Sequence, residues 1–308
     1  MLKIAIIGAG NVGGQIAMLL IKEGIAADIL LLDVAKGLAK GKALDLEDFA
    51  SINKYDCRIE GSEDFSLLKD AGIIAITAGL ARKPGMTRDD LLKKNYEIVR
   101  DVSLQVKKYA NNPIVIAVTN PVDLMTYLVY KTTGFDKRKV FGMGISLDAA
   151  RFANLIHQEL NVSVRDIEPV VIASHGQAML PLMRLTKVSQ ASLEKLVDKD
   201  AAYNIGRATV ERGASIVAHL GSGSAYFGPA QATVNIIKAI VKDEKRIIGV
   251  CAYLDGEYGL KELYLGVPAR VGKNGVEDII QLELDDKERQ AFLQSAESIR
   301  KQIQQILN

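Results

Sequence analysis

The chain has 308 residues, which is long enough for two domains of ordinary size or for one large α/β unit. Hydrophobic residues make up 48% of it and charged residues 25%, proportions that exclude a disordered or fibrous protein. The 39 Lys and Arg residues nearly balance the 37 Asp and Glu residues, and a formal charge of +2 without a block of like charges argues against a nucleic-acid partner.

The chain begins with a strand, a glycine-rich turn and a helix. Residues 4–7 form a continuous apolar run closed by glycine, typical of a strand buried on both faces. Apolar residues at helical spacing follow from Gln15, and residues 29–33 return as a second strand, which completes a βαβ unit. Glycines and polar residues divide the uncharged stretch 4–21 into runs too short to cross a bilayer, so we expect no membrane partner.

Strands and helices continue to alternate as far as about residue 141. Helices are predicted at residues 39–49 and 91–109, and strands at residues 72–77 and 113–118. Because this alternation is typical of parallel sheets, we expect an α/β fold with a Rossmann doubly wound sheet.

The pattern changes in the second half of the chain. The predicted elements are helices at 147–160 and within 202–241, strands at 169–173, 246–253 and 262–270, the last two as a meander, and a terminal helix at 286–307. We therefore expect a dinucleotide-binding domain at residues 1–142, followed by an α+β substrate-binding domain at residues 143–308.

A glycine-rich segment follows the first predicted strand. The pattern GxGxxG is formed by Gly8, Ala9, Gly10, Asn11, Val12 and Gly13. Such glycines let the backbone turn sharply and approach a pyrophosphate at the helix N-terminus. Asp33 stands 20 residues after Gly13, where a carboxylate accepts hydrogen bonds from ribose hydroxyls and repels a 2′-phosphate, which favours NAD over NADP. The alternatives are a tight βα turn for the glycines and a strand-end turn residue for Asp33.

Histidine is the side chain suited to carry a proton at neutral pH, and the chain has three. His157 and His219 lie in predicted helices, where a structural role is the better interpretation. His175 follows a predicted strand in a loop between Ser174 and Gly176, so it is either a catalyst facing a cleft or an ordinary surface residue.

Other polar residues accompany this histidine in the sequence. Asp148 and Arg151 are spaced to share one helical face, either in a site or as a solvated ion pair. Arg82 and Arg88 lie in a loop after a predicted strand; they belong either to a site or to a basic surface loop. Asn120 stands at another strand end, the edge at which parallel sheets bind ligands, although asparagine before proline also suits a turn.

Taken together, these segments resemble the malate/lactate dehydrogenase superfamily over essentially the whole chain. Within it they are most similar to the malate dehydrogenases of lactate-dehydrogenase-like sequence. The matching segments are GAGNVG at 8–13, Asp33, AGLARKPGMTR at 78–88, Asn95, VTNPVD at 118–123, GISLDAAR at 144–151 and SHG at 174–176.

The resemblance implies NAD-dependent oxidation of malate and a role for each matched residue. It implies that His175 is the acid/base for the substrate hydroxyl and that Asp148 orients and stabilises its imidazolium. It implies that Arg151 binds the C1 carboxylate bidentately, that Arg88 polarises the substrate carbonyl, and that Asn120 touches both substrate and nicotinamide. Asn95, Val118, Thr119 and Asn120 correspond to cofactor contacts.

Arg82 distinguishes the substrate. In this family an arginine at the matching position pairs with the second carboxylate of malate or oxaloacetate, whereas lactate dehydrogenases usually have glutamine there. The alternatives are a lactate or other 2-hydroxyacid dehydrogenase and a non-catalytic NAD-binding protein.

The resemblance also implies a homodimer or homotetramer, with the helix at 39–49 as the dimer face. The alternative is that the apolar positions of this helix pack within one subunit. Cys57 and Cys251 stand in no disulfide-scaffold or zinc-ligand spacing, so we expect no metal site and a cytoplasmic location.

Overall fold

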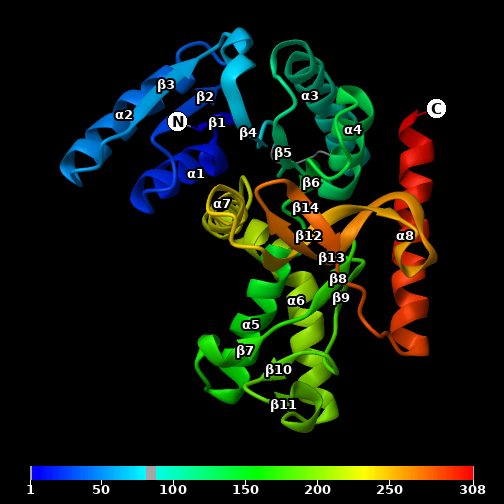
Figure 1. Ribbon diagram of the computed structural model, residues 1–308. Helices are drawn as coiled ribbons and strands as arrows, with labels where there is room; N and C mark the ends of the chain where they lie inside the picture. Colours follow the sequence, from blue (N-terminus) through cyan, green and yellow to red (C-terminus); the bar gives the residue numbers. More distant parts are fainter. Residues whose placement is uncertain (1, 81–87, 308) are drawn as a thin grey trace.

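A single sheet of 11 strands runs through the molecule and is covered by helices (Figure 1). The computed structural model describes residues 2–80 and 88–307. The strands of this sheet follow the order β3-β2-β1-β4-β5-β6-β12-β13-β8-β9, and β14 pairs with β13. The change from parallel to antiparallel pairing occurs between β6 and β12, where the first half of the chain meets the second.

The first half is a parallel sheet in the doubly wound order. Its strands are β1 (Lys3–Ile7), β2 (Asp28–Leu32), β3 (Arg58–Ser62), β4 (Ala71–Ile76), β5 (Ile114–Ala117) and β6 (Val140–Gly142). Its helices are α1 (Asn11–Lys22), α2 (Leu38–Ile52), α3 (Arg88–Tyr109) and α4 (Val122–Thr133), with a 3₁₀ turn η1 (Phe65–Asp70). This order confirms the predicted Rossmann sheet.

The second half combines an antiparallel extension of the sheet with longer helices. Its strands in the main sheet are β8 (Val171–Ala173), β9 (Met179–Pro181), β12 (Arg246–Asp255), β13 (Lys261–Gly272) and β14 (Gly275–Ile279). A small second sheet holds β7 (Ile167–Glu168), β10 (Lys187–Val188) and β11 (Ala191–Ser192). The helices are α5 (Ser146–Leu160), α6 (Lys199–Leu220), α7 (Phe227–Val241) and α8 (Asp286–Leu307), with 3₁₀ turns η2 (Val164–Asp166), η3 (Leu193–Lys195) and η4 (Glu257–Gly259).

The structure contains elements that the sequence analysis did not predict, notably β3, α4 and β6. Strand β3 has the sequence RIEGS, in which only Ile59 is buried, so it lacks an apolar run. Helix α4 begins directly after Asn120-Pro121, a dipeptide for which a turn was the alternative to a ligand-binding strand end, and β6 has only three residues. The predicted first helix also begins four residues earlier than expected, at Asn11, because glycines do not prevent its first turn.

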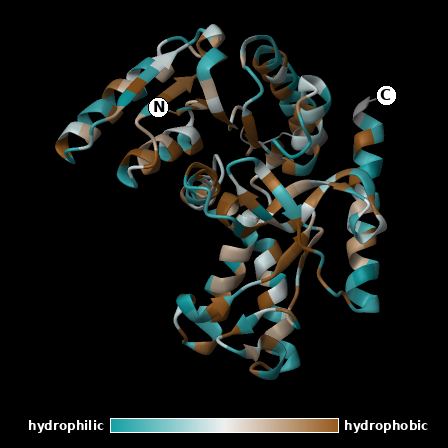
Figure 2. Ribbon diagram, viewed as in Figure 1, coloured by the Kyte–Doolittle hydropathy of each residue, from teal (hydrophilic) through white to brown (hydrophobic). Residues whose placement is uncertain are grey.

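The core lies on both faces of the central strands. Residues 4–7 and 29–32 are almost completely buried, and hydrophobic residues follow the strands in Figure 2. A second apolar cluster lies beneath α5 around Phe152, Ile156 and Leu193. The described helices include none that is long and apolar enough to cross a membrane.

Helices α1 and α7 connect the two halves of the chain. They pack against each other, and Glu23 at the C-terminal end of α1 reaches two side chains of α7. Its carboxylate accepts a hydrogen bond from the Gln231 amide at 2.7 Å and forms an ion pair with Lys238 at 3.2 Å. Burial raises the pKa of Glu23, but these partners outweigh it, so the net pKa lies below its usual range.

Candidate active site

The glycine-rich turn joins β1 to α1 and leaves space above the helix N-terminus. Gly8 has a φ of +103°, which favours glycine, and a Cβ on Gly13 would lie 1.9 Å from the Gly8 carbonyl oxygen. Gly10 is the N-cap residue, and a Cβ there would meet no atom within 4 Å. Gly8 and Gly13 are therefore required by the turn itself, whereas Gly10 leaves room for a ligand at the backbone N–H groups of α1.

Asp33 follows β2 beside this turn. Its carboxylate accepts the backbone N–H groups of Ala9 at 2.7 Å and Ala35 at 2.9 Å, and the side chain is half-buried. A carboxylate has about four acceptor positions, so these two bonds leave capacity for ribose hydroxyls. Asn11 is exposed and Val12 is half-buried at the start of α1. The space at Gly10 and the acceptor at Asp33 fit the pyrophosphate and ribose of NAD.

The ends of β4 and β5 are tied together by buried polar side chains. Asn95 of α3 is only 2% exposed; its Oδ1 accepts the Leu80 N–H at 2.8 Å, and its Nδ2 donates to the Asn120 carbonyl at 2.9 Å. The Thr119 hydroxyl donates to the Ala78 carbonyl at 2.7 Å. The contacts of Asn95 and Thr119 thus position the backbone around Asn120. Asn120 itself is exposed at this edge of the sheet.

The predicted site also includes Val118, Arg82 and Arg88. Val118 is buried, and its N–H donates to the Ile76 carbonyl at 2.9 Å. Arg82 lies outside the described residues. Arg88 is the first residue of α3, and only its backbone is described.

His175 and Asp148 meet across two elements. The Nδ1 atom of His175 lies 2.6 Å from Oδ2 of Asp148, which stands in the first turn of α5. The Asp148 side chain is completely buried, and that of His175 is 12% exposed. Because the carboxylate accepts at Nδ1, this nitrogen carries a proton and Nε2 is the one available to a substrate.

The pKa of His175 lies above its ordinary value. Burial alone would lower it, but the carboxylates of Asp148 and Asp123 outweigh burial by favouring the imidazolium. The two carboxylates therefore favour the protonated form of the ring.

Arg151 shares the same carboxylate. Its Nη1 donates to Oδ1 of Asp148 at 3.1 Å, and its side chain is only 11% exposed. The alternative of a solvated intrahelical ion pair is therefore wrong, because α6 covers this face of α5. Burial lowers the pKa of Arg151, and Asp148 opposes that effect. Arginine stays charged, so this face of α5 is suited to bind an anion.

Asp123, which the sequence analysis quoted in a motif without giving it a role, anchors the histidine loop. It is buried at the start of α4, and its Oδ2 accepts the His175 backbone N–H at 2.9 Å and the Ser174 hydroxyl at 3.0 Å. Burial raises the pKa of this carboxylate, although those donors and Cys251 oppose the effect. The available signal was an acid among the apolar residues Val122 and Leu124, a pattern that indicates a paired buried charge.

The other two histidines lie elsewhere. Nδ1 of His157 contacts the Val162 carbonyl at 2.6 Å near the end of α5. Nδ1 of His219 contacts the Ser215 carbonyl at 2.8 Å within α6. Both observations agree with the structural roles expected of these residues.

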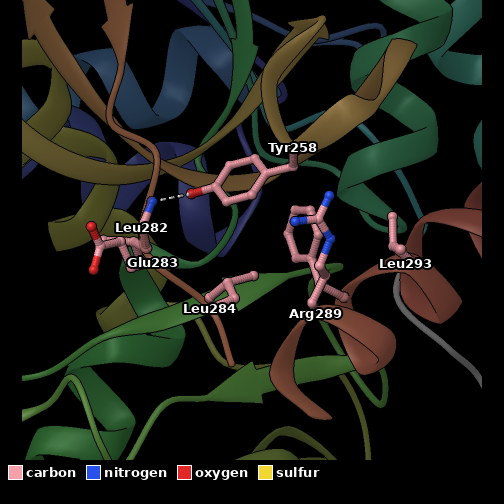
Figure 3. A pocket seen from close by; sticks show the side chains of 7 residues that line it. Tyr258, Leu282, Glu283, Leu284, Arg289 and Leu293 are labelled. Carbon is pink, nitrogen blue, oxygen red and sulfur yellow. Dashed lines mark hydrogen bonds between the residues drawn. The ribbon is translucent and has the colours of Figure 1, made fainter. Parts of the chain in front are cut away.

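A separate hollow of about 230 Å³ lies beside α8 (Figure 3). It is lined by Tyr258, Leu282, Glu283, Leu284, Arg289, Phe292 and Leu293. The Tyr258 hydroxyl at its edge accepts the Leu282 N–H at 2.9 Å. Its lining shares no residue with the His175 site, and we assign it no part in the chemistry.

Comparisons with known proteins match nearly the whole chain. The profile of the lactate/malate dehydrogenase NAD binding domain matches residues 2–142, and that of the lactate/malate dehydrogenase alpha/beta C-terminal domain matches residues 145–308. A malate dehydrogenase from Chlorobium chlorochromatii is 44% identical over 97% of both chains.

Two solved structures have the same fold. The malate dehydrogenase of Picrophilus torridus in its apo form has a TM-score of 0.95 at 39% identity, covering 99% of this chain and 97% of that one. A lactate dehydrogenase from Cryptosporidium parvum, complexed with lactic acid and nicotinamide adenine dinucleotide, has a TM-score of 0.96 at 34% identity, covering 100% of this chain and 98% of that one. The chain belongs to the lactate/malate dehydrogenase family.

Proposed function

We propose that this protein is an NAD-dependent malate dehydrogenase, which interconverts malate and oxaloacetate as the tricarboxylic acid cycle requires. The observation that carries the chemistry is the buried Asp148 carboxylate, which holds an imidazole and a guanidinium side by side. Malate is favoured as the substrate because full-length relatives at 42–46% identity carry the name malate dehydrogenase.

His175 moves the proton in this reaction. NAD, when bound, supplies the acceptor for the hydride that leaves C2 of malate. Nε2 of neutral His175 takes the C2 hydroxyl proton, and the resulting imidazolium is stabilised by Asp148 at Nδ1. In the reverse direction the imidazolium returns this proton to the carbonyl oxygen of oxaloacetate as the hydride reaches C2.

The remaining site residues bind the substrate and the cofactor. Arg151 holds the C1 carboxylate, for which its planar guanidinium is a bidentate match. By resemblance, Arg82 pairs with the distal carboxylate, Arg88 polarises the carbonyl and Asn120 touches substrate and nicotinamide. The cofactor residues are Gly8, Ala9, Gly10, Asn11, Val12, Gly13, Asp33, Asn95, Val118, Thr119 and Asn120. We assign residues 1–142 to cofactor binding and residues 143–308 to substrate binding and catalysis.

The proposal extends to a homodimer or homotetramer in the cytoplasm. The assembly is supported by α2, which leaves Leu38, Leu44 and Ile52 exposed, with Ile52 at 78%. These side chains offer a face for a second copy of the chain. Light scattering of the purified protein should give a mass of two or four chains, and Leu44→Lys should lower it; a monomeric parent would contradict the assembly. Fractionation of source cells would test the location.

The substrate is tested by turnover of NADH with two keto acids. The parent should oxidise NADH much faster with oxaloacetate than with pyruvate. Arg82→Gln should lower kcat/KM for oxaloacetate by roughly two to four orders of magnitude, because a buried carboxylate loses its charge partner, and should raise the pyruvate rate. An oxaloacetate-to-pyruvate ratio that did not change in the variant would remove Arg82 from substrate selection.

The pH dependence of reduction should report the Asp148–His175 pair. Oxaloacetate reduction needs protonated His175, so kcat/KM should decline as pH rises through a pKa above the ordinary 6.5. Asp148→Asn removes a charge that raises this pKa, so the decline should move to lower pH. His175→Asn should reduce turnover roughly 10²- to 10⁴-fold in both directions. The control is Asp200→Asn, an exposed acid on α6; if it moved the decline as far as Asp148→Asn, the assignment would be wrong.

Two glycines of one turn should respond differently to alanine. Gly13→Ala forces a Cβ against the Gly8 carbonyl and should destabilise the cofactor-free fold by about 1–3 kcal/mol. Gly10→Ala meets open space and should leave the unfolding temperature nearly unchanged, yet weaken NADH binding because the methyl group occupies the pyrophosphate position. Thermal unfolding and NADH fluorescence titration measure the two effects. Parental NADH affinity in Gly10→Ala would place the pyrophosphate elsewhere.

A further inference from the structure

A second arginine lies beside Arg151. Arg212 of α6 donates from Nη2 to Oδ1 of Asn154 at 3.0 Å. Asn154 follows Arg151 by three residues on α5, so both side chains lie on the helix face that packs against α6. Gly213 follows Arg212, and a Cβ at Gly213 would lie 3.5 Å from Nη1 of Arg151. The two guanidinium groups are therefore neighbours at the interface of these helices.

Among the described side chains, Asp148 alone forms an ion pair with Arg151 or Arg212. Asp148 is the acid paired with Arg151, and the same carboxylate also serves His175. Arg212 takes part in no ion pair with any side chain described at residues 2–80 and 91–305, and its partner Asn154 is a neutral amide. Burial lowers the pKa of Arg151, and the like charge of Arg212 lowers it further. Two close cations with one shared carboxylate are stabilised by an incoming anion.

We propose that Arg212 is an affinity-determining residue, whose charge strengthens binding of the substrate carboxylate that Arg151 holds. This inference rests on the proposed function. Arg212 acts through the electrostatic potential at Arg151 and is not assigned a contact with substrate. The amide of Asn154 holds the Arg212 guanidinium without neutralising its charge. Asp148 pairs with His175 and Arg151.

The alternative is a purely structural role, in which Arg212 only fastens α6 to α5 through Asn154. The two roles respond differently to substitution. Arg212→Gln keeps a hydrogen-bond donor but loses the charge, and Arg212→Lys keeps the charge but loses the planar guanidinium. Asn154→Ala removes the fastening acceptor while Arg212 remains charged.

The control lies on the same helix. Arg207 forms an exposed pair with Glu211 at 3.5 Å, one turn further toward the N-terminus of α6. Arg207→Gln makes the same change in net charge as Arg212→Gln, outside the cluster. Because Arg207 and Glu211 are both exposed, the loss of their pair contributes little, so a difference between the two variants reports the position of the charge.

The experiment measures oxaloacetate kinetics and the calorimetric dissociation constant of malonate, a dicarboxylate that accepts no hydride, with NADH present. At low salt, Arg212→Gln should raise KM for oxaloacetate and the dissociation constant of malonate by roughly three- to tenfold, with kcat within about twofold. The difference should shrink as salt is added, because screening weakens the effect of a partly exposed charge. Arg212→Lys and Arg207→Gln should resemble the parent.

Two results would overturn the inference. One is an Arg212→Gln variant that binds malonate as tightly as Arg207→Gln. The other is a loss of affinity in Arg212→Lys and Asn154→Ala equal to that in Arg212→Gln, which would indicate the structural role; thermal unfolding identifies any variant that fails to fold. A parent that does not reduce oxaloacetate would contradict the proposed function instead, while the malonate comparison still decides the role of Arg212.

Discussion

The site depends on the contacts of one buried carboxylate, that of Asp148. Its side chain has no exposed surface, so each oxygen must be satisfied from within the protein. One oxygen meets the His175 ring and the other meets Arg151, which lie on different elements. A buried charge without partners is strongly destabilising, and this cost holds the imidazole and the guanidinium in a single arrangement before any substrate arrives. Orientation of the reacting groups therefore comes with folding.

The sheet explains how residues distant in sequence meet at this carboxylate. Parallel strands from the first half end at one edge, where the glycine turn and Asn120 lie. The antiparallel strands continue the same sheet and carry the His175 loop at the end of β8. Asp123 then fastens that loop to α4 of the first half through the His175 backbone N–H. The His175 loop is thus held by elements from both halves of the chain.

Much of this arrangement was predictable from sequence, because it depends on local patterns. The glycine spacing with Asp33 indicated the cofactor turn, and a three-residue helical spacing placed Asp148 beside Arg151. Spacing does not report burial, so the solvated alternative for that pair stayed open until α6 was seen to cover it. The anchoring role of Asp123 was missed because its partner, the His175 backbone, is 52 residues away. Strand β3 escaped prediction because it is an edge strand: it pairs with β2, and only one of its residues, Ile59, is buried.

The contact of Glu23 with Gln231 and Lys238 bears on how the protein moves. Helix α1 has 12 residues and is a rod about 18 Å long, with the glycine-rich turn at one end and this contact at the other. A hinge rotation of one half against the other would swing that rod and pull the far end of α1 from α7. The ion pair and the packing along both helices resist such a rotation. The two halves of the chain are therefore braced against each other at this contact, and movement is easier in segments shorter than a domain.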